Sequence, residues 1–146
     1  MKAVIQRVSY ASVAIAGEII SEIGSGLLIL IGVIQGDVEK DVDYMVKKIV
    51  ELRIFRDSSQ NMNLSLQDVC GEALVVSQFT LCCDISKGRR PSFIDAAEPK
   101  MAEKIYEQYC HKLQLINIPV VKGKFGADMD VKLINDGPVT IVLDSR

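Results

Sequence analysis

The sequence predicts an α+β fold in which a mainly antiparallel β-sheet or barrel is flanked by two α-helices, within a single domain spanning residues 1–146. Two patterns predict this class. Short β-branched segments alternate with turn residues, and two longer segments repeat apolar residues at helical spacing. No repeat, linker or low-complexity tract divides the 146 residues, a length that lets one domain bury about 68–70% of its unfolded surface.

The first part of the chain predicts three strands. An extended, β-branched segment runs from Val4 to Ile15, and the turn residues Ala16-Gly17-Glu18 follow it. The chain returns as a strand from Ile19 to Ile23, after which Gly24-Ser25-Gly26 interrupts the pattern. Leu27 to Ile34 is almost wholly apolar, which predicts a strand that is buried on both faces.

Apolar residues spaced by three and four predict two helices. Asp37 is the predicted N-cap of the first helix, and the second begins near Pro99 because proline suits the first helical position. The apolar face of the first helix consists of Val38, Val42, Met45, Val46, Ile49 and Leu52. The apolar face of the second consists of Met101, Ala102, Ile105, Tyr109 and Leu113.

Four further strands complete the predicted sheet. One runs from Ala73 to Phe79, and another from Val120 to Phe125. The last two run from Met129 to Ile134 and from Val139 to Leu143. A break at Asn135-Asp136-Gly137-Pro138 separates these last two strands, since glycine and proline interrupt regular structure.

Composition excludes several classes of function. With 17 Lys and Arg against 19 Asp and Glu, the net charge is −2, so a non-specific polyanion-binding protein is disfavoured, although local basic patches are still allowed. The longest apolar stretch, Gly26–Ile34, has nine residues, whereas a membrane-spanning helix needs about 20. The first residues lack the apolar run of a signal peptide. We therefore expect a cytoplasmic protein without membrane contact.

The cysteines and the single histidine exclude further chemistry. The four cysteines have no CxxC spacing, and Cys82 and Cys83 are adjacent, so we expect reduced, mostly buried thiols. His111 is the only imidazole and falls off the apolar face of its helix, which argues against a catalytic triad and against a zinc site. Neither GxGxxG nor a P-loop is present. The sequence predicts neither a metal nor a cofactor.

Two segments are unusual as structural elements. Ser77-Gln78-Phe79-Thr80 ends an apolar strand in groups that donate or accept hydrogen bonds, although a strand that simply runs out into solvent also explains it. Asn135-Asp136-Gly137-Pro138-Val139-Thr140 contains Asp-Gly, a strong hairpin signal. The following proline is unusual there because it removes a donor from the returning strand. A cis Gly137-Pro138 bond is one way to accommodate it, and the pattern is compatible with either isomer.

A basic loop lies between the predicted fourth strand and the second helix. It contains Lys87, Arg89 and Arg90. Such a loop either contacts phosphates, which gives salt-dependent binding without sequence information, or is a solvated loop that Pro91 and Phe93 anchor to the core.

Together these segments resemble the D-aminoacyl-tRNA deacylase family over the whole chain. The two segments Ser77–Leu81 and Asn135–Thr140, at this separation in 146 residues, are highly specific. The motifs that carry the resemblance are Gln6-Arg7-Val8, Ala11-Ser12-Val13, Ser77-Gln78-Phe79-Thr80-Leu81, Lys87-Gly88-Arg89-Arg90-Pro91-Ser92-Phe93, Phe125-Gly126-Ala127-Asp128-Met129 and Asn135-Asp136-Gly137-Pro138-Val139-Thr140.

The resemblance implies a homodimeric hydrolase with its active sites at the dimer interface. Its partners are D-aminoacyl-tRNA and glycyl-tRNA, including glycine mischarged on tRNA-Ala, and it cleaves the ester to the 3′-terminal adenosine. A Gly-cis-Pro pair of one subunit, here Gly137-Pro138, enters the pocket of the other and excludes L-amino acids. Arg7 orients that pair.

Other residues take their expected roles from the same resemblance. Ser77, Gln78, Phe79 and Thr80 surround the reacting ester as catalytic residues. The terminal adenosine is expected near Phe125 and Met129. The basic residues Lys87, Arg89 and Arg90 are expected to meet acceptor-stem phosphates.

The reaction mechanism stays open at the level of sequence. Backbone N–H groups near Phe79 and Thr80 are candidates to stabilise the oxyanion of an already activated ester. Thr80 is either a nucleophile, for which the sequence offers no base, or a positioning residue beside water that the 2′-hydroxyl of the tRNA activates. Two other classes of function compete: a non-catalytic nucleic-acid-binding dimer, and a thiol enzyme that uses Cys82 or Cys83.

Overall fold

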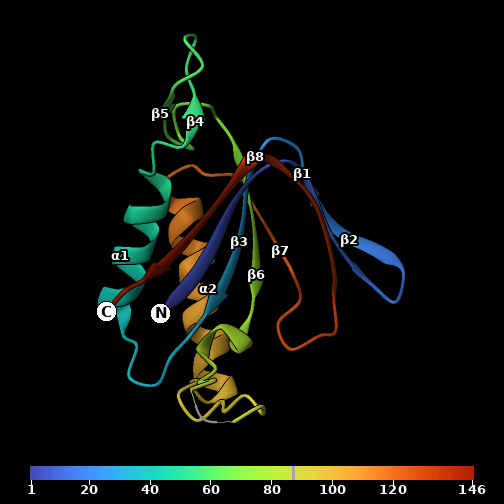
Figure 1. Ribbon diagram of the computed structural model, residues 1–146, viewed down its shortest axis with the longest axis vertical. Helices are drawn as coiled ribbons and strands as arrows, with labels where there is room; N and C mark the ends of the chain where they lie inside the picture. Colours follow the sequence, from blue (N-terminus) through green and yellow to red (C-terminus); the bar gives the residue numbers. More distant parts are fainter. Residues whose placement is uncertain (87) are drawn as a thin grey trace.

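A computed structural model describes residues 1–86 and 88–146 and confirms the α+β class. One curved, six-stranded mixed sheet has the order β2-β1-β3-β6-β7, with β8 paired to β1, and both helices lie on one side of it (Figure 1). The elements are β1 (Lys2–Ile15), β2 (Glu18–Ile23), β3 (Gly26–Gly32), α1 (Glu39–Val50), β4 (Phe55–Arg56), β5 (Met62–Leu64), β6 (Glu72–Ser77), the 3₁₀ helix η1 (Phe79–Cys82), α2 (Pro99–Leu115), β7 (Val120–Lys122) and β8 (Asp130–Asp144).

Strand β1 organises the sheet. On one side its first half pairs with β3 and its second half with β2, while on the other side β8 pairs along nearly its whole length, all antiparallel. The pairs β3–β6 and β6–β7 are parallel because α1 and α2 cross over between them. The prediction of a mainly antiparallel sheet is therefore confirmed, with a parallel portion that the sequence pattern did not indicate.

The central strand β3 is buried on both faces, as its continuous apolar run predicts. Leu27, Ile29 and Ile31 pack toward α1 and α2, whereas Leu28 and Leu30 pack into a second apolar cluster on the other, concave face. The helices contribute their predicted apolar faces to the first cluster, with two exceptions: Val38 and Met101 are exposed. Both lie at the start of their helix, outside the turns that pack on the sheet.

Asp37 is not the N-cap of α1. The N-cap is Val38, and the side chain of Asp41 accepts a hydrogen bond from its N–H at 3.0 Å. Asp37 is buried instead, where it pairs with the Met1 ammonium group at 2.8 Å and with Arg146 at 2.9 Å. The carboxylate thus ties the two ends of the chain together, a long-range role that a local helix signal does not predict.

Several strand boundaries differ from the prediction. Strand β6 ends at Ser77 and η1 follows, so the predicted strand to Phe79 is too long. Strand β7 ends at Lys122 and not at Phe125. The two predicted strands on either side of Asn135–Pro138 are one strand, β8, because both halves pair with β1 in the same direction. The Asp-Gly signal therefore marks a bulge within a strand and not a hairpin turn.

A small two-stranded hairpin was not predicted. Strands β4 and β5 form it, and it extends from the body of the molecule beside the end of α1 (Figure 1). The Asp57 carboxylate closes its loop by accepting from the N–H groups of Ser59 and Asn61 at 2.8 and 3.0 Å. The strands are too short for a period-two pattern to identify them.

The thiols and the histidine follow the sequence expectation in part. All four cysteines are free, but only Cys82 and Cys110 are buried, whereas Cys70 is exposed. His111 is exposed, as predicted. Across residues 1–86 and 88–146, every helix is too short or too polar to cross a membrane.

The parallel pair β3–β6 depends on a glycine at the start of β3. A Cβ at Gly26 would lie 2.0 Å from the Glu72 carbonyl oxygen, so Gly26→Ala must push the two strands apart. We expect it to lower the free energy of unfolding by about 3 kcal/mol. At Gly24 the nearest atom would lie 3.7 Å away, so Gly24→Ala is a matched control with little expected effect. Urea denaturation measures both, and equal stabilities would contradict this packing.

Candidate active site

A cavity of about 680 Å³ opens where β3 and β6 end. Its walls come from four places: the strand ends, the loop around residues 93–97, the first turns of α2 and the segment 125–131. The residues that line it are Ile31, Val33, Gln35, Val76, Ser77, Gln78, Phe79, Phe93, Ile94, Ala96, Ala97, Glu98, Pro99, Ala102, Tyr106, Phe125, Gly126, Ala127, Asp128, Met129 and Val131. Predicted site residues from two distant segments, Ser77–Phe79 and Phe125–Met129, therefore meet at one cavity.

The polar strand end is held by the neighbouring strand and then turns away. Ser77 stands beside Ile31 in the parallel register, and the Gln78 N–H donates to the Ile31 carbonyl oxygen at 2.8 Å. The chain then enters η1. The Leu81 N–H closes its first turn by donating to the Gln78 carbonyl oxygen at 3.2 Å. The N–H groups of Phe79 and Thr80 precede that bond, so the turn itself offers them no acceptor.

Thr80 lies beside the cavity lining and is exposed. The Gln78 side-chain amide donates to the Thr80 hydroxyl oxygen at 2.5 Å. An amide nitrogen that donates is not a base, so this contact orients the hydroxyl group without deprotonating it.

Aromatic rings form two parts of the wall. Phe79 and Phe93 meet edge to face with centroids 5.0 Å apart, and Phe79 is 59% exposed. On the other side Phe125 packs on Tyr106 at 5.8 Å. The Tyr106 hydroxyl donates to the Val75 carbonyl at 2.9 Å, and burial raises the pKa of Tyr106 well above its usual range. Tyr106 is thus a wall residue and not an acid–base group.

The described part of the lining contains no His, Cys, Lys or Arg. Its carboxyl groups, Glu98 and Asp128, come from the start of α2 and from the 125–131 segment and not from the strand end. Cys82, the last residue of η1, is buried; its thiol donates to the Val33 carbonyl at 3.4 Å, and burial raises the pKa of that thiol. A raised pKa disfavours the reactive thiolate, which argues against a thiol enzyme that uses Cys82.

The structure offers no ready metal centre in the ranges 1–86 and 88–146, where no three His, Cys, Asp or Glu residues gather to hold an ion. The cavity residues that could contact a ligand are mainly amide, hydroxyl and apolar groups, together with the carboxyl groups of Glu98 and Asp128.

Gly137 and Pro138 lie elsewhere, in a bulge of β8. The pairing of β1 with β8 jumps from Gln6–Thr140 to Val8–Asn135, which leaves residues 136–139 opposite Arg7 alone. The peptide bond between Gly137 and Pro138 is cis, and both residues are exposed.

Arg7 is buried beneath this bulge and holds it. Its Nε donates to the Asp136 carbonyl oxygen at 2.8 Å and pairs with the Asp136 carboxylate at 3.2 Å, while its Nη1 donates to the carbonyl of Ile54. Arg56 pairs with the same carboxylate at 3.3 Å from the β4–β5 hairpin. Arg7, Gly137 and Pro138 are not part of the cavity lining, so one chain keeps the two groups of predicted site residues apart.

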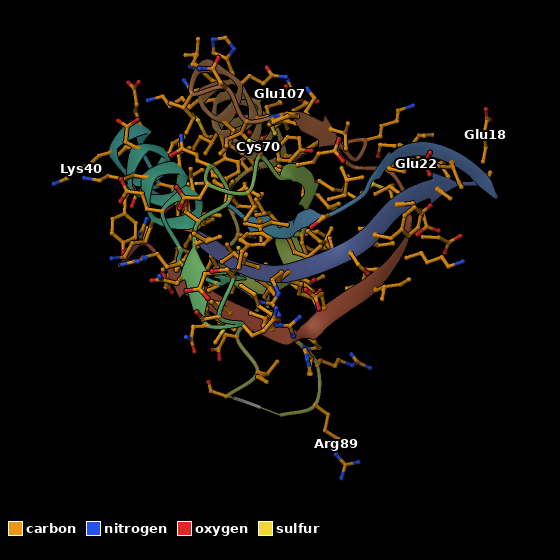
Figure 2. All side chains as sticks on the ribbon, turned by 90° about the horizontal axis from the view of Figure 1, so that it is seen from above. Glu18, Glu22, Lys40, Cys70, Arg89 and Glu107 are labelled. Carbon is orange, nitrogen blue, oxygen red and sulfur yellow. The ribbon has the colours of Figure 1, made fainter. Side chains whose placement is uncertain are left out.

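The basic loop is anchored at its base and exposed at its tip. Asp84 and Ser92 exchange backbone hydrogen bonds of 2.8 and 2.9 Å. Arg89 and Arg90 are exposed, and Arg89 points away from the body of the molecule (Figure 2). Lys87 lies outside the described residues.

Sequence reasoning missed several wall residues. Gln35, Glu98 and Tyr106 line the cavity without belonging to any recognised motif. The only local signal was Pro99, which correctly marks the start of α2 and hence one wall. Nothing in the spacing indicated that this helix start would face the end of β6.

Comparison with known proteins gives the site its context. The family model described as D-Tyr-tRNA(Tyr) deacylase matches residues 4–144. The D-aminoacyl-tRNA deacylase of Dehalococcoides mccartyi strain BAV1 is 54% identical over 100% of this chain and 95% of that protein. The protein of the same name from Desulfatibacillum aliphaticivorans is 53% identical, with full coverage of both chains.

Solved structures agree with the fold. One titled c-Myc DNA Unwinding Element Binding Protein superposes with a TM-score of 0.96 and 45% identity, covering 100% of this chain and 99% of that one. A probable eukaryotic D-amino acid tRNA deacylase superposes with a TM-score of 0.82 at 16% identity, covering 97% of each chain, and so shares the fold. With a family match from residue 4 to residue 144 and relatives more than half identical over its full length, the chain belongs to the D-Tyr-tRNA(Tyr) deacylase family.

Proposed function

We propose that the protein hydrolyses the ester of D-aminoacyl-tRNA to give a free D-amino acid and tRNA. Family membership and the names of the relatives support this reaction. The observation that carries it is the cavity where Ser77, Gln78 and Phe79 meet Phe125 and Met129. Its volume of about 680 Å³ is in the range of small-molecule sites and suits an aminoacylated nucleoside.

Each group of residues receives a role in this proposal. The strand end at Ser77 and Gln78 lies beside the reacting ester, with Phe79 on the same side. The apolar wall of Phe125 and Met129 receives the terminal adenine ring. Thr80 positions the substrate, because its hydroxyl oxygen already accepts from the Gln78 amide, a group that cannot act as a base.

The chemistry requires little from titratable side chains. Water adds to the ester carbonyl carbon, the bond to the ribose 3′-oxygen breaks, and that oxygen takes up a proton. The neighbouring 2′-hydroxyl of the tRNA assists the attacking water. The N–H groups of Phe79 and Thr80 stabilise the oxyanion, and loss of one such donor typically lowers the rate by about 10²–10³-fold.

A second copy of the chain completes the site in this proposal. Gly137-Pro138 lies outside the cavity of its own chain, so a homodimer is needed to bring it to the ester. The outer edge of β8 supports such an assembly: within residues 1–86 and 88–146 the strand pairs with β1 alone, and Ile134 and Val142 are 58% and 77% exposed on it.

Exclusion then explains the choice of substrate. The carbonyl oxygens of Gly137 and Pro138 hold the substrate ammonium group and crowd one face of its Cα atom. An L side chain collides with this backbone, whereas a D side chain points outward. Glycine has no side chain, so glycyl-tRNA, including glycine mischarged on tRNA-Ala, is also a substrate. Arg89 and Arg90 contact acceptor-stem phosphates.

A non-catalytic nucleic-acid-binding dimer is the second candidate. The name of the solved relative at 45% identity, a DNA unwinding element binding protein, favours it. The net charge of −2 argues against a protein whose main task is to bind polyanions.

Hydrolysis of matched D- and L-tyrosyl-tRNA distinguishes these candidates. We expect release of labelled amino acid from the D form and little from the L form. Binding of tRNA without release from either form would favour the non-catalytic dimer. Equal release from both forms would contradict the exclusion by Gly137-Pro138.

Gly137→Ala is expected to impair turnover of the D substrate. The φ of Gly137 is +146°, and a Cβ would lie 2.7 Å from the Val139 side chain and 3.0 Å from Arg7, so the bulge must shift. The chain still folds because the bulge is exposed. Gly17→Ala is the control, since Gly17 has a φ of +82° in a distant turn with open space around it. Steady-state kinetics measure both, and full activity of the Gly137 variant would contradict the assignment.

Thr80→Val is expected to retain activity within about tenfold, because it removes a positioning contact of ordinary hydrogen-bond strength. Thr80→Ser keeps the hydroxyl group and is the matched control. If Thr80 were the nucleophile, the valine variant alone would be inactive, and an acyl-enzyme on Thr80 would be trapped by acid quenching of the wild-type reaction.

A further inference from the structure

We infer that Asn135 is the residue that sets chiral specificity by positioning Gly137-Pro138, and that its side-chain amide acts as a clamp across the bulge. This inference rests on the proposed function, because it concerns which substrates the bulge excludes. Asn135 belongs to the bulge segment, but neither the cavity nor the chemistry proposed above uses its side chain.

The side chain of Asn135 forms hydrogen bonds with both the N–H and the carbonyl group of one residue, Val139. Its Oδ1 accepts from the Val139 N–H at 2.7 Å, and its Nδ2 donates to the Val139 carbonyl oxygen at 3.2 Å. The same Nδ2 also donates to the Thr140 hydroxyl at 3.0 Å. In an antiparallel sheet, a residue on the neighbouring strand accepts from the N–H and donates to the carbonyl of the residue opposite it. The Asn135 carboxamide makes the same two hydrogen bonds to Val139.

This substitute is needed because β1 cannot supply the pairing. The ladder stops at Gln6–Thr140 and resumes at Val8–Asn135, so Val139 lacks a partner on β1. Asn135 and Val139 are the two ends of the excursion that contains Gly137-Pro138. By joining these ends, the amide fixes the width of the bulge at its base.

Arg7 and Asn135 hold different parts of the bulge. Arg7 fixes Asp136 from below through the Asp136 carbonyl and carboxylate. Asn135 fixes the far end through Val139. Without the amide, the peptide groups of Gly137-Pro138 would still be attached at Asp136 but free to swing at the other end.

A filter that works by exclusion fails in a characteristic way when its wall becomes mobile. The L substrate gains access, whereas the D substrate loses only part of the contact between its ammonium group and the bulge carbonyls, so the ratio of L to D hydrolysis rises. Displacements of about 1 Å are enough to change rates strongly in active sites. A role in selectivity therefore raises the rate on the L form, which a general loss of structure does not do.

Asn135→Asp is the sharpest test. The carboxylate keeps the shape of the side chain and still accepts from the Val139 N–H, but it cannot donate to the Val139 carbonyl or to Thr140. Gln114→Glu makes the same change of amide to carboxylate on an exposed position of α2 and is the matched control. Thr140→Val removes a single acceptor of the clamp and leaves Asn135 intact.

We expect Asn135→Asp to raise the ratio of L- to D-tyrosyl-tRNA hydrolysis by about five- to tenfold, the equivalent of one hydrogen bond. Thr140→Val is expected to raise the ratio less, and Gln114→Glu to leave it unchanged. Urea denaturation tests whether each variant is folded. If Asn135→Asp does not fold, the L-to-D ratio of the Thr140→Val variant tests the inference instead.

An unchanged ratio in folded Asn135→Asp, or a fall in D activity without any gain on the L form, would overturn the inference while the proposed function stands. A wild-type protein that does not discriminate between the two substrates would overturn both.

Discussion

The buried guanidinium group of Arg7 is the constraint around which the bulge of β8 and the start of the β4–β5 hairpin are arranged. A charge inside a sheet is tolerated only when it is paired and hydrogen-bonded. Arg7 finds its partners at Asp136 and at the carbonyl of Ile54, which draws β8 out of its ladder and holds the start of the β4–β5 hairpin against β1. The bulge that presents Gly137 and Pro138 is therefore a consequence of satisfying one buried charge.

The cavity forms where strand β6 ends in polar residues between apolar walls. Buried pairing ends at Ser77, and the backbone turns into η1 with the N–H groups of Phe79 and Thr80 left outside its hydrogen-bonding pattern. Phe79 and Thr80 are exposed beside the aromatic and apolar walls, so a substrate that covers them would exclude water and strengthen the electrostatic effect of these N–H groups. An activated ester needs this kind of stabilisation more than it needs a strong base.

The bulge and the cavity lie on different parts of one chain, and this separation makes the proposed second copy central to the function. Each chain has an exposed bulge at Gly137-Pro138 and a separate open cavity. In the proposed dimer the bulge would act through main-chain atoms, so its recognition would be blind to the identity of the substrate side chain and sensitive to its chirality. Arg7 and Asn135 both hold the bulge in place, which agrees with a role for Gly137-Pro138 that depends on the position of its main-chain atoms.

The sequence by itself determined the class of fold, the buried strand β3 and both helices, because burial imposes periods of two and 3.6 on the chain; it also singled out Ser77–Phe79 and Phe125–Met129, which line one cavity. The close match of two separated motifs also indicated the family. The local sequence pattern wrongly predicted Asp37 to be the helix N-cap, and it wrongly predicted a hairpin turn at Asp136-Gly137. Both errors have the same cause: a partner far along the chain, Met1 in one case and Arg7 in the other, outweighs the local signal.

Only the tertiary structure decided which walls enclose the cavity and what holds the bulge. Gln35, Glu98 and Tyr106 reach the cavity because the start of α2 and the 93–97 loop pack beside the ends of β3 and β6. The contacts of Asn135 and Arg56 likewise depend on a break in the register of β1 and β8 and on the place of the β4–β5 hairpin. Periodicity indicates which face of an element is buried, but not which distant element covers it. The cavity and the bulge both depend on contacts between distant elements, so periodicity could not predict them.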